Sequence, residues 1–358
     1  MAGYLTDTFG NPSSIHAAGQ EARRALDRAR DRVAAAIGAR GEEIVFTGSG
    51  TEADNLALIG SYLAARGRKN HLITAATEHH AILHTVETLR ELGAETTLVP
   101  VDGDGRVDPE EIRRVVRPDT FLISVMAANN EIGTLAPMAE IAAVARECDV
   151  PFHTDAVQVV GAVPLHVDDP RVDMLTLTAH KFYGPKGAGA LYVRRGTPLK
   201  PILHGGGQER GRRPGTENVP AIMGLAQALE LAVRDMPVES ARQAALRDRL
   251  ITHVLAEPPG AVLNGHPTMR LPNNTNFSFP GLESDLLLVN LDLEGVAASS
   301  GSACTAGAIE PSHVLAALGG GHARAISAVR LTLGRATSAA DVDSAAEILA
   351  RVVHRLRD

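Results

Sequence analysis

The sequence contains no tryptophan, and aromatic residues make up only 3% of it. Proteins that bind single-stranded nucleic acids stack bases on aromatic side chains, so this scarcity argues against such a role. The 42 acidic residues also outnumber the 35 basic ones, for a net charge of -7. An acidic chain is a poor non-specific binder of phosphate backbones. We therefore expect no direct nucleic-acid binding.

Cysteine is also scarce, since the chain contains only Cys148 and Cys304. Two cysteines exclude a disulfide framework and favour a reducing compartment. The first residues show no basic segment followed by an apolar run, and no stretch approaches the ~18 apolar residues of a membrane span. We expect a cytoplasmic protein with no signal peptide and no membrane segment.

The 358 residues, 44% hydrophobic and 22% charged, are typical of a globular protein with one large and one small domain. Strand-like and helix-like segments alternate over the first two hundred residues, which predicts an α/β fold with a mainly parallel sheet and helices on both faces. The predicted strands are 42–46, 71–75, 95–101, 120–126, 150–155, 173–179 and 189–194, and the predicted helices are 18–37, 54–67, 80–93, 110–116 and 137–149.

The pattern changes after a helix predicted near 218–235. A connecting helix follows (MPVESARQAALRDRLITHVLA), then short strands separated by Gly, Pro and Asn, and a last helix over 339–356. We therefore expect a large α/β domain over 1–235 and a smaller α+β domain over 236–358.

Ligands of open α/β sheets bind at the carboxyl ends of the strands, so the residues that follow each strand are the candidates. The segment TGSGTEADN (47–55) leads into a helix. Its glycines and hydroxyls, with the free amides of the helix N-terminus, form a candidate phosphate cradle. A capped turn is the alternative, and no Gly-Lys-Ser/Thr of a P-loop follows.

Two further strands end in polar residues. His79 could stack on a flat ring or be structural, and Asn129 and Asn130 could contact a ring substituent or form a turn. His80 and His84 have helical i, i+4 spacing, but no third ligand is evident, so we expect no metal site.

Asp155 and Lys181 each follow a buried strand. Asp155 could pair with a protonated ring nitrogen or cap the next helix. Lys181 could be a desolvated nucleophile for carbonyls or a solvated surface lysine. A phosphate cradle, a ring-stacking histidine, an aspartate for a ring nitrogen and a lysine for a Schiff base together describe a site for pyridoxal 5'-phosphate.

The motifs resemble those of the group I cysteine desulfurases (NifS/IscS-like), in the class V aminotransferase branch of the fold-type I pyridoxal-phosphate enzymes. The matching segments, in family order over nearly the whole chain, are FGNPSSIH (9–16), FTGSGTEADN (46–55), TEHHAIL (77–83), NNEIG (129–133), DAVQ (155–158), HKFYGPKG (180–187), HGGGQERGRRPGTEN (204–218), SSGSACTAG (299–307) and VRLTLGR (329–335).

The resemblance implies a role for individual residues. Lys181 would form the Schiff base with the cofactor, His79 would stack on its ring and help move protons, and Asp155 would pair with its nitrogen. The phosphate would be bound by Gly50, Thr51, Thr178 and His180, and by Thr216 of the neighbouring subunit in a homodimer. Asn130 and Gln158 would contact the ring oxygen and the substrate side, Asn11 the substrate, and Arg330 the substrate carboxylate.

The resemblance also implies that Cys304 accepts sulfur from L-cysteine as a persulfide, releasing alanine. Its Gly/Ser-rich surroundings, SSGSACTAG, suit a thiolate that has to move. Cys148, at the end of an apolar helix, is interpreted as structural. The sulfur would pass to an acceptor protein, either an iron–sulfur scaffold or a tRNA- or DNA-thiolation enzyme.

One departure from the family pattern leaves alternatives open. Family members usually begin with a strand and a turn ahead of the GNPSS segment, whereas this sequence begins almost at GNPSS. A selenocysteine lyase or other class V pyridoxal enzyme, a catalytically impaired homologue, and a cofactor-binding protein without activity are the alternatives.

Overall fold

The computed structural model describes residues 1–301 and 311–358. The chain forms two compact units. The first consists of residues 1–99, 109–127 and 137–236, and the second of residues 100–108, 128–136 and 237–358. Two short segments from the first 235 residues, 100–108 and 128–136, thus belong to the second unit.

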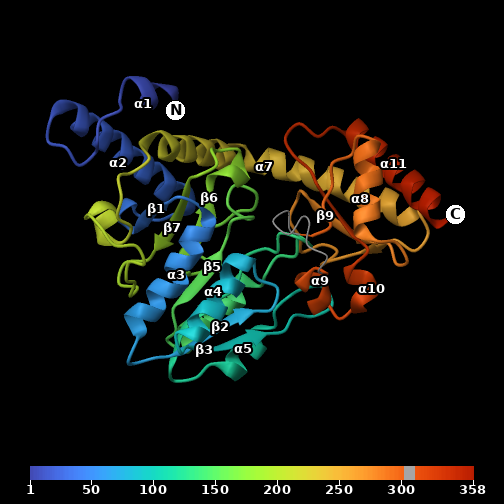
Figure 1. Ribbon diagram of the computed structural model, residues 1–358, viewed down its shortest axis with the longest axis horizontal. Coiled ribbons are helices and arrows are strands. Elements are labelled where there is room, and N and C mark those ends of the chain that lie inside the picture. Colours follow the sequence, from blue (N-terminus) through green and yellow to red (C-terminus); the bar gives the residue numbers. More distant parts are fainter. Residues whose placement is uncertain (302–310) are drawn as a thin grey trace. The chain divides into compact units, whose positions relative to one another are not determined.

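A seven-stranded sheet with the order β1-β7-β6-β5-β4-β2-β3 forms the centre of the first unit (Figure 1). Its strands are β1 (Ile44–Thr47), β2 (His71–Ala75), β3 (Glu95–Val99), β4 (Thr120–Ser124), β5 (Phe152–Asp155), β6 (Met174–Thr178) and β7 (Gly189–Val193). The five strands from β6 to β3 are parallel, whereas β7 runs antiparallel to both β1 and β6. Most strands are buried along their whole length, as expected for a sheet covered on both faces.

The first unit also contains helices. They include α1 (Ala2–Thr6), α2 (Ala17–Ile37), α3 (Gly50–Ala65), α4 (His80–Glu91), α5 (Pro109–Val115) and α6 (Met138–Glu147). Helix α3 packs on β7, β6, β4 and β1, and α4 packs on α3 and β3 (Figure 1). The apolar residues of α2 recur with helical spacing, so one face of that helix is buried. The predicted α/β fold class is confirmed.

The second unit contains a three-stranded antiparallel sheet with the order β10-β9-β8. Its strands are β8 (Val262–Leu263), β9 (Asn274–Ser278) and β10 (Ala328–Thr332), and its helices are α8 (Ser284–Leu293), α9 (His313–Ala317), α10 (Gly321–Ala325) and α11 (Ala339–Arg357). Phe277 of β9 and Phe279, which follows this strand, form a core with Leu287 of α8 and Leu349 of α11.

The two helices predicted near 218–256 form one continuous helix, α7 (Val219–Ala256), with Pro237 inside it. A proline removes one backbone N–H from a helix but does not always end it. The C-terminal part of α7 contributes Leu250 and Val254 to the core of the second unit. That burial offers a reason for the helix to continue past the proline.

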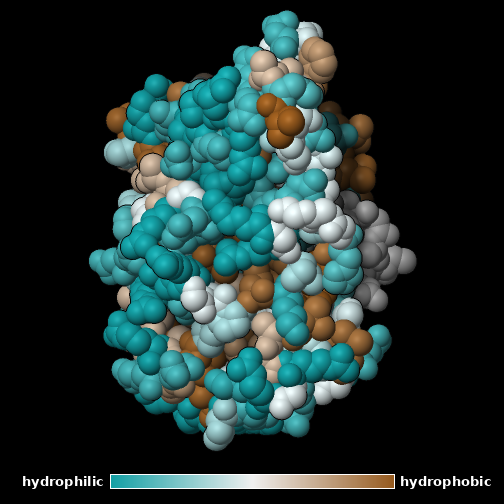
Figure 2. Space-filling model, turned by 90° about the vertical axis from the view of Figure 1, so that its left-hand side faces the viewer, coloured by the Kyte–Doolittle hydropathy of each residue, from teal (hydrophilic) through white to brown (hydrophobic). Residues whose placement is uncertain are grey.

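Figure 2 shows a mostly hydrophilic face with small hydrophobic patches between the polar residues. Within residues 1–301 and 311–358, no helix has the length and apolarity to cross a membrane.

Candidate functional site

The segment that leads from β1 into α3 forms a tight, capped helix start. Ser49 is the N-cap, and its Oγ accepts a hydrogen bond from the Glu52 N–H at 3.0 Å. Glu52 Oε2 accepts a hydrogen bond from the Gly48 N–H at 2.8 Å, and its carboxylate pairs with Arg213 at 2.7 Å. The capped turn expected as an alternative is therefore present, and it leaves Gly50 and Thr51 in the first turn of α3.

Gly50 lies where the helix start meets the ends of two strands. A Cβ at this position would lie 3.1 Å from Val157 Cγ2 and 3.4 Å from Thr178 Cβ. Thr178, the last residue of β6, is buried, and its Oγ1 lies 3.3 Å from Nδ1 of the exposed His180. The structure thus brings together the predicted phosphate-binding residues Gly50, Thr178 and His180, beside the positive end of a helix dipole.

Asp155 ends β5, and its side chain is buried. Its Oδ1 accepts a hydrogen bond from the Val157 N–H at 2.9 Å, so it does cap the turn that follows. Burial raises the pKa of Asp155 to about 6, and the Val157 amide and the charge of Lys181 oppose that rise. Lys181 is itself exposed, so the desolvation suggested by the sequence is not provided at this position.

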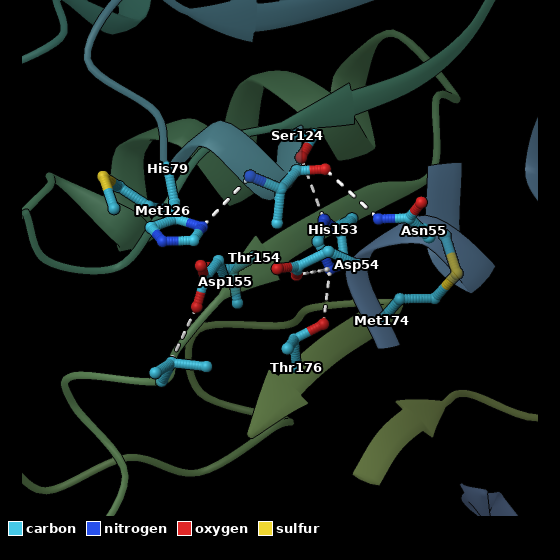
Figure 3. Close-up of polar contacts among 12 residues, drawn as sticks. Asp54, Asn55, His79, Ser124, Met126, His153, Thr154, Asp155, Met174 and Thr176 are labelled. Carbon is cyan, nitrogen blue, oxygen red and sulfur yellow. Dashed lines mark hydrogen bonds and ion pairs between the residues drawn. The ribbon is translucent and has the colours of Figure 1, made fainter. Parts of the chain in front are cut away.

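His79 is the N-cap of α4, and its Nδ1 accepts a hydrogen bond from the Ala81 N–H at 3.1 Å. This contact fixes the ring at the end of β2 (Figure 3). The preceding residue, Glu78, is fully buried, and its Oε1 accepts a hydrogen bond from the Met126 N–H at 2.7 Å. Burial raises the pKa of Glu78, and the charge of Asp155 raises it further.

A row of buried polar side chains lies beside Asp155 (Figure 3). Ser124 Oγ lies 2.9 Å from His153 Nδ1, and His153 Nε2 lies 3.1 Å from Thr176 Oγ1. Asp54 of α3 approaches His153 Nε2 with Oδ1 at 3.7 Å. Asp54, Glu78 and His153 were not predicted as site residues. The signal was present in part, because His153 and Asp155 are two residues apart on one strand and share a face.

The second unit holds two predicted substrate residues in contact. Arg330 Nη1 donates a hydrogen bond to the Asn130 carbonyl oxygen at 2.9 Å. The backbone of Arg330 pairs with that of Ser299, five residues before Cys304. Asn129 forms the turn expected as the alternative, since its Oδ1 accepts hydrogen bonds from the Glu131 and Ile132 amides.

Other predicted residues are not joined to these groups by any contact found among the described residues. Asn11 Oδ1 accepts a local hydrogen bond from the Ser13 N–H, Gln158 is half-buried, and Thr216 is exposed three residues after Arg213. Cys148 is a half-buried free cysteine. Cys304 lies outside the described residues.

The residues of the first unit fit pyridoxal 5'-phosphate. The helix start at Gly50, with Thr178 and His180, offers amide and hydroxyl donors for a phosphate. Asp155 offers a buried carboxylate, which a protonated ring nitrogen would stabilise. Lys181 supplies an amine whose charge acts on Asp155.

Known proteins resemble the chain over nearly its full length. The family model described as aminotransferase class-V matches residues 1–344. The cysteine desulfurase IscS of Dictyoglomus turgidum is 48% identical over 357 residues, covering 100% of this chain and 91% of the relative. A solved NifS-like protein superposes with a TM-score of 0.91 at 35% identity, covering 99% of this chain and 94% of that one.

A second solved structure, of SspA in complex with cysteine, superposes with a TM-score of 0.82 at 37% identity and covers 92% of each chain. The fold, the order of the strand-end residues and the family match agree. The chain therefore belongs to the class-V aminotransferase family.

Proposed function

We propose that this protein is a cysteine desulfurase, which converts L-cysteine to L-alanine with pyridoxal 5'-phosphate as cofactor. The observation that carries the proposal is its 48% identity, over the whole chain, to a protein named cysteine desulfurase. Pyridoxal 5'-phosphate is the cofactor of the class-V aminotransferase family, and when bound it withdraws electrons from the substrate's α-carbon.

The first unit would bind and activate the cofactor. The amides at the start of α3, together with Thr51, Thr178 and His180, would hold its phosphate. Asp155 would fix the ring nitrogen in its protonated form, and His79 would cover the ring. The Lys181 amine would bind the aldehyde carbon and, once cysteine displaces it, would take the α-proton, with His79 as the other candidate base.

Arg330 would bind the substrate carboxylate, because a guanidinium can donate two parallel hydrogen bonds to one. The Cys304 thiolate would then attack the sulfur of the bound cysteine. An S–S bond forms as the C–S bond breaks, and the electron pair stays on the carbon side, which takes up a proton. Alanine leaves, and Cys304 carries the persulfide.

Further features extend the proposal. The protein would be a cytoplasmic homodimer, in which Thr216 reaches the phosphate of the partner subunit and Asn11, Asn130 and Gln158 contribute to the substrate side. The persulfide sulfur would pass to an acceptor protein, either an iron–sulfur scaffold or a tRNA- or DNA-thiolation enzyme.

Mass spectrometry after addition of L-cysteine tests the proposal. We expect a mass increase of one sulfur atom on Cys304. Cys148→Ser, the matched control, should still gain this sulfur, whereas Cys304→Ser should bind the cofactor but gain none. A sulfur adduct that persists in Cys304→Ser would contradict the role of Cys304.

Two further measurements separate the alternatives. Lys181→Ala should lose the visible absorbance of the cofactor's imine. Rates on cysteine and selenocysteine should be comparable or favour cysteine, and a large preference for selenocysteine would instead indicate a selenocysteine lyase.

A further inference from the structure

Three carboxyl groups from different elements are buried together in the first unit. Asp54 of α3 is 1% exposed, Glu78 after β2 is 0% exposed and Asp155 of β5 is 6% exposed. The charge of Asp155 acts on both Asp54 and Glu78. Burying three interacting negative charges would destabilise the folded state strongly, so we expect some of these groups to hold a proton.

Asp54 lies at the end of a hydrogen-bonded row that crosses three neighbouring strands. Ser124 of β4, His153 of β5 and Thr176 of β6 form the row, and each is fully buried. The Thr176 hydroxyl also hydrogen-bonds the Asp54 carboxyl. Thr176 pairs directly with Asp155 in the register of β5 and β6, so the row lies next to Asp155 on the sheet.

The surroundings of Asp54 favour its neutral form. Its Oδ1 is buried, accepts no hydrogen bond within the described part of the chain, and lies 3.7 Å from His153 Nε2. Burial lowers the pKa of His153 to about 3, so this imidazole is neutral and does not offset a negative charge. Burial, followed by the charge of Asp155, raises the pKa of Asp54 well above its usual range; the Thr176 hydroxyl opposes this rise, and the charge of Glu78 adds to it.

Asp54 receives a hydrogen bond from Thr176, and Asp155 receives one from the Val157 amide. Asp155 differs in that the positive charge of Lys181 also favours its ionised form. Asp155 therefore loses its proton more readily than Asp54 does.

We propose that Asp54 is a positioning residue that keeps its proton in the folded protein. As a neutral acid, Asp54 contacts Thr176 and His153, the neighbours of Asp155 on the sheet. Because Asp54 stays neutral, the negative charge stays on Asp155. What Asp155 does with that charge rests on the proposed function, but the proton on Asp54 does not.

Infrared difference spectroscopy tests this directly. At pH 8 the unaltered protein should show the carbonyl absorption of a protonated carboxyl, shifted in D2O, and Asp54→Asn should remove one such component. The matched control is Asp27→Asn, which alters an exposed carboxylate paired with Arg23 and should leave this region unchanged. If the spectra of Asp54→Asn and the unaltered protein did not differ in this carbonyl absorption, the proposal would be overturned.

The visible absorbance of the bound cofactor gives a second readout. An asparagine has the shape and neutrality of a protonated aspartate, so the cofactor should titrate at the same pH in Asp54→Asn and in the unaltered protein. A lower midpoint in the variant would mean that Asp54 carries a negative charge, and the proposal would fail.

A third measurement needs no variant. In the unaltered chain labelled with 13C-aspartate, one carboxyl carbon should keep the chemical shift of a protonated acid up to pH 8, and its absence would contradict the proposal. Infrared and carbon measurements also work without cofactor. A protein that failed to release sulfur from cysteine yet kept the protonated carboxyl would refute the proposed function alone.

Discussion

At the scale of single residues, Asp155 shows how burial prepares a side chain for a ligand. Burial disfavours the charge of this carboxylate, which receives one amide hydrogen bond, and so lowers the free energy of unfolding. A cationic ligand that binds beside the carboxylate offsets this loss. Asp155 thus lowers the stability of the folded chain and, under the proposed function, would favour the binding of a positively charged ring nitrogen.

Asp155→Asn should stabilise the cofactor-free protein at pH 8 by roughly 1–3 kcal/mol, because it removes a buried charge. The folded pKa of about 6 lies above the usual 3.8, so the ionised form is disfavoured by folding. The cost is fully present above pH 6 and disappears as the pH falls toward 4. Urea unfolding at pH 8 and pH 4 measures both values, and an equal gain at the two pH values would contradict this account.

The same titration affects the cofactor. As the pH falls through 6, Asp155 takes up a proton and no longer attracts a ring cation. The affinity for pyridoxal 5'-phosphate should weaken over this range in the unaltered protein. In Asp155→Asn the affinity should be lower, with a flatter pH dependence, as measured by equilibrium titration of the visible absorbance.

Arg330→Lys should raise the KM for L-cysteine by about 10- to 100-fold, with a smaller change in kcat. A lysine cannot reproduce a two-pronged guanidinium contact, and a charge-assisted hydrogen bond contributes about 1.5–3 kcal/mol. Steady-state kinetics separates the two constants. If KM stays constant while kcat falls, Arg330 does not bind the substrate carboxylate.

At the scale of elements, a buried ion pair fixes the loop around Glu209, which is not part of the sheet. Arg30 of α2 and Glu209 form a two-pronged pair with distances of 2.6 and 2.7 Å, and both side chains are almost fully buried. Glu209 Oε2 also accepts a hydrogen bond from the Phe46 N–H. Glu209 and Arg210 both have positive φ values, so the pair holds a loop in a conformation that non-glycine residues rarely adopt.

Glu209→Ala should lower the free energy of unfolding by about 3–5 kcal/mol, because Arg30 would stay buried without its partner. The double variant Arg30→Met/Glu209→Ala should recover part of this loss. Asp343→Ala, which breaks the exposed pair with Arg249, should cost far less stability than Glu209→Ala. Denaturant unfolding measures all three, and equal losses for the buried and exposed pairs would contradict the prediction.

The strands and helices of the first unit were predictable from the sequence because each has a clear periodicity bounded by turn residues. The antiparallel direction of β7 was not, since a strand's direction depends on its partners and on loop geometry. The continuity of α7 through Pro237 was missed because a proline normally signals a helix end.

The candidate site was predictable where residues follow strands, as Asp155 and Lys181 do. Asp54 was hidden because it belongs to a helix whose sequence, EADNLAL, also fits an exposed first turn. Its burial depends on α3 packing on β6 and β4, a tertiary contact that local periodicity does not encode.

At the scale of the whole molecule, cofactor binding and folding stability are coupled. A ligand that binds only the folded state stabilises it by an amount set by its concentration and affinity, about 3 kcal/mol at a hundredfold excess over Kd. Removing pyridoxal 5'-phosphate should therefore lower the thermal unfolding midpoint. In Lys181→Ala, removal of the cofactor should lower the unfolding midpoint by less. Calorimetry of the cofactor-bound and cofactor-free forms checks both expectations. An unchanged midpoint after removal would indicate that the cofactor contributes nothing to the folded state.

The backbone pairing between Ser299 and Arg330 connects two parts of the proposed function. Ser299 precedes Cys304 by five positions in the sequence, and Arg330 would bind the substrate carboxylate. A substitution that shifts strand β10 would therefore displace Ser299 as well. Under the proposed function, such a change should impair substrate binding and persulfide formation together.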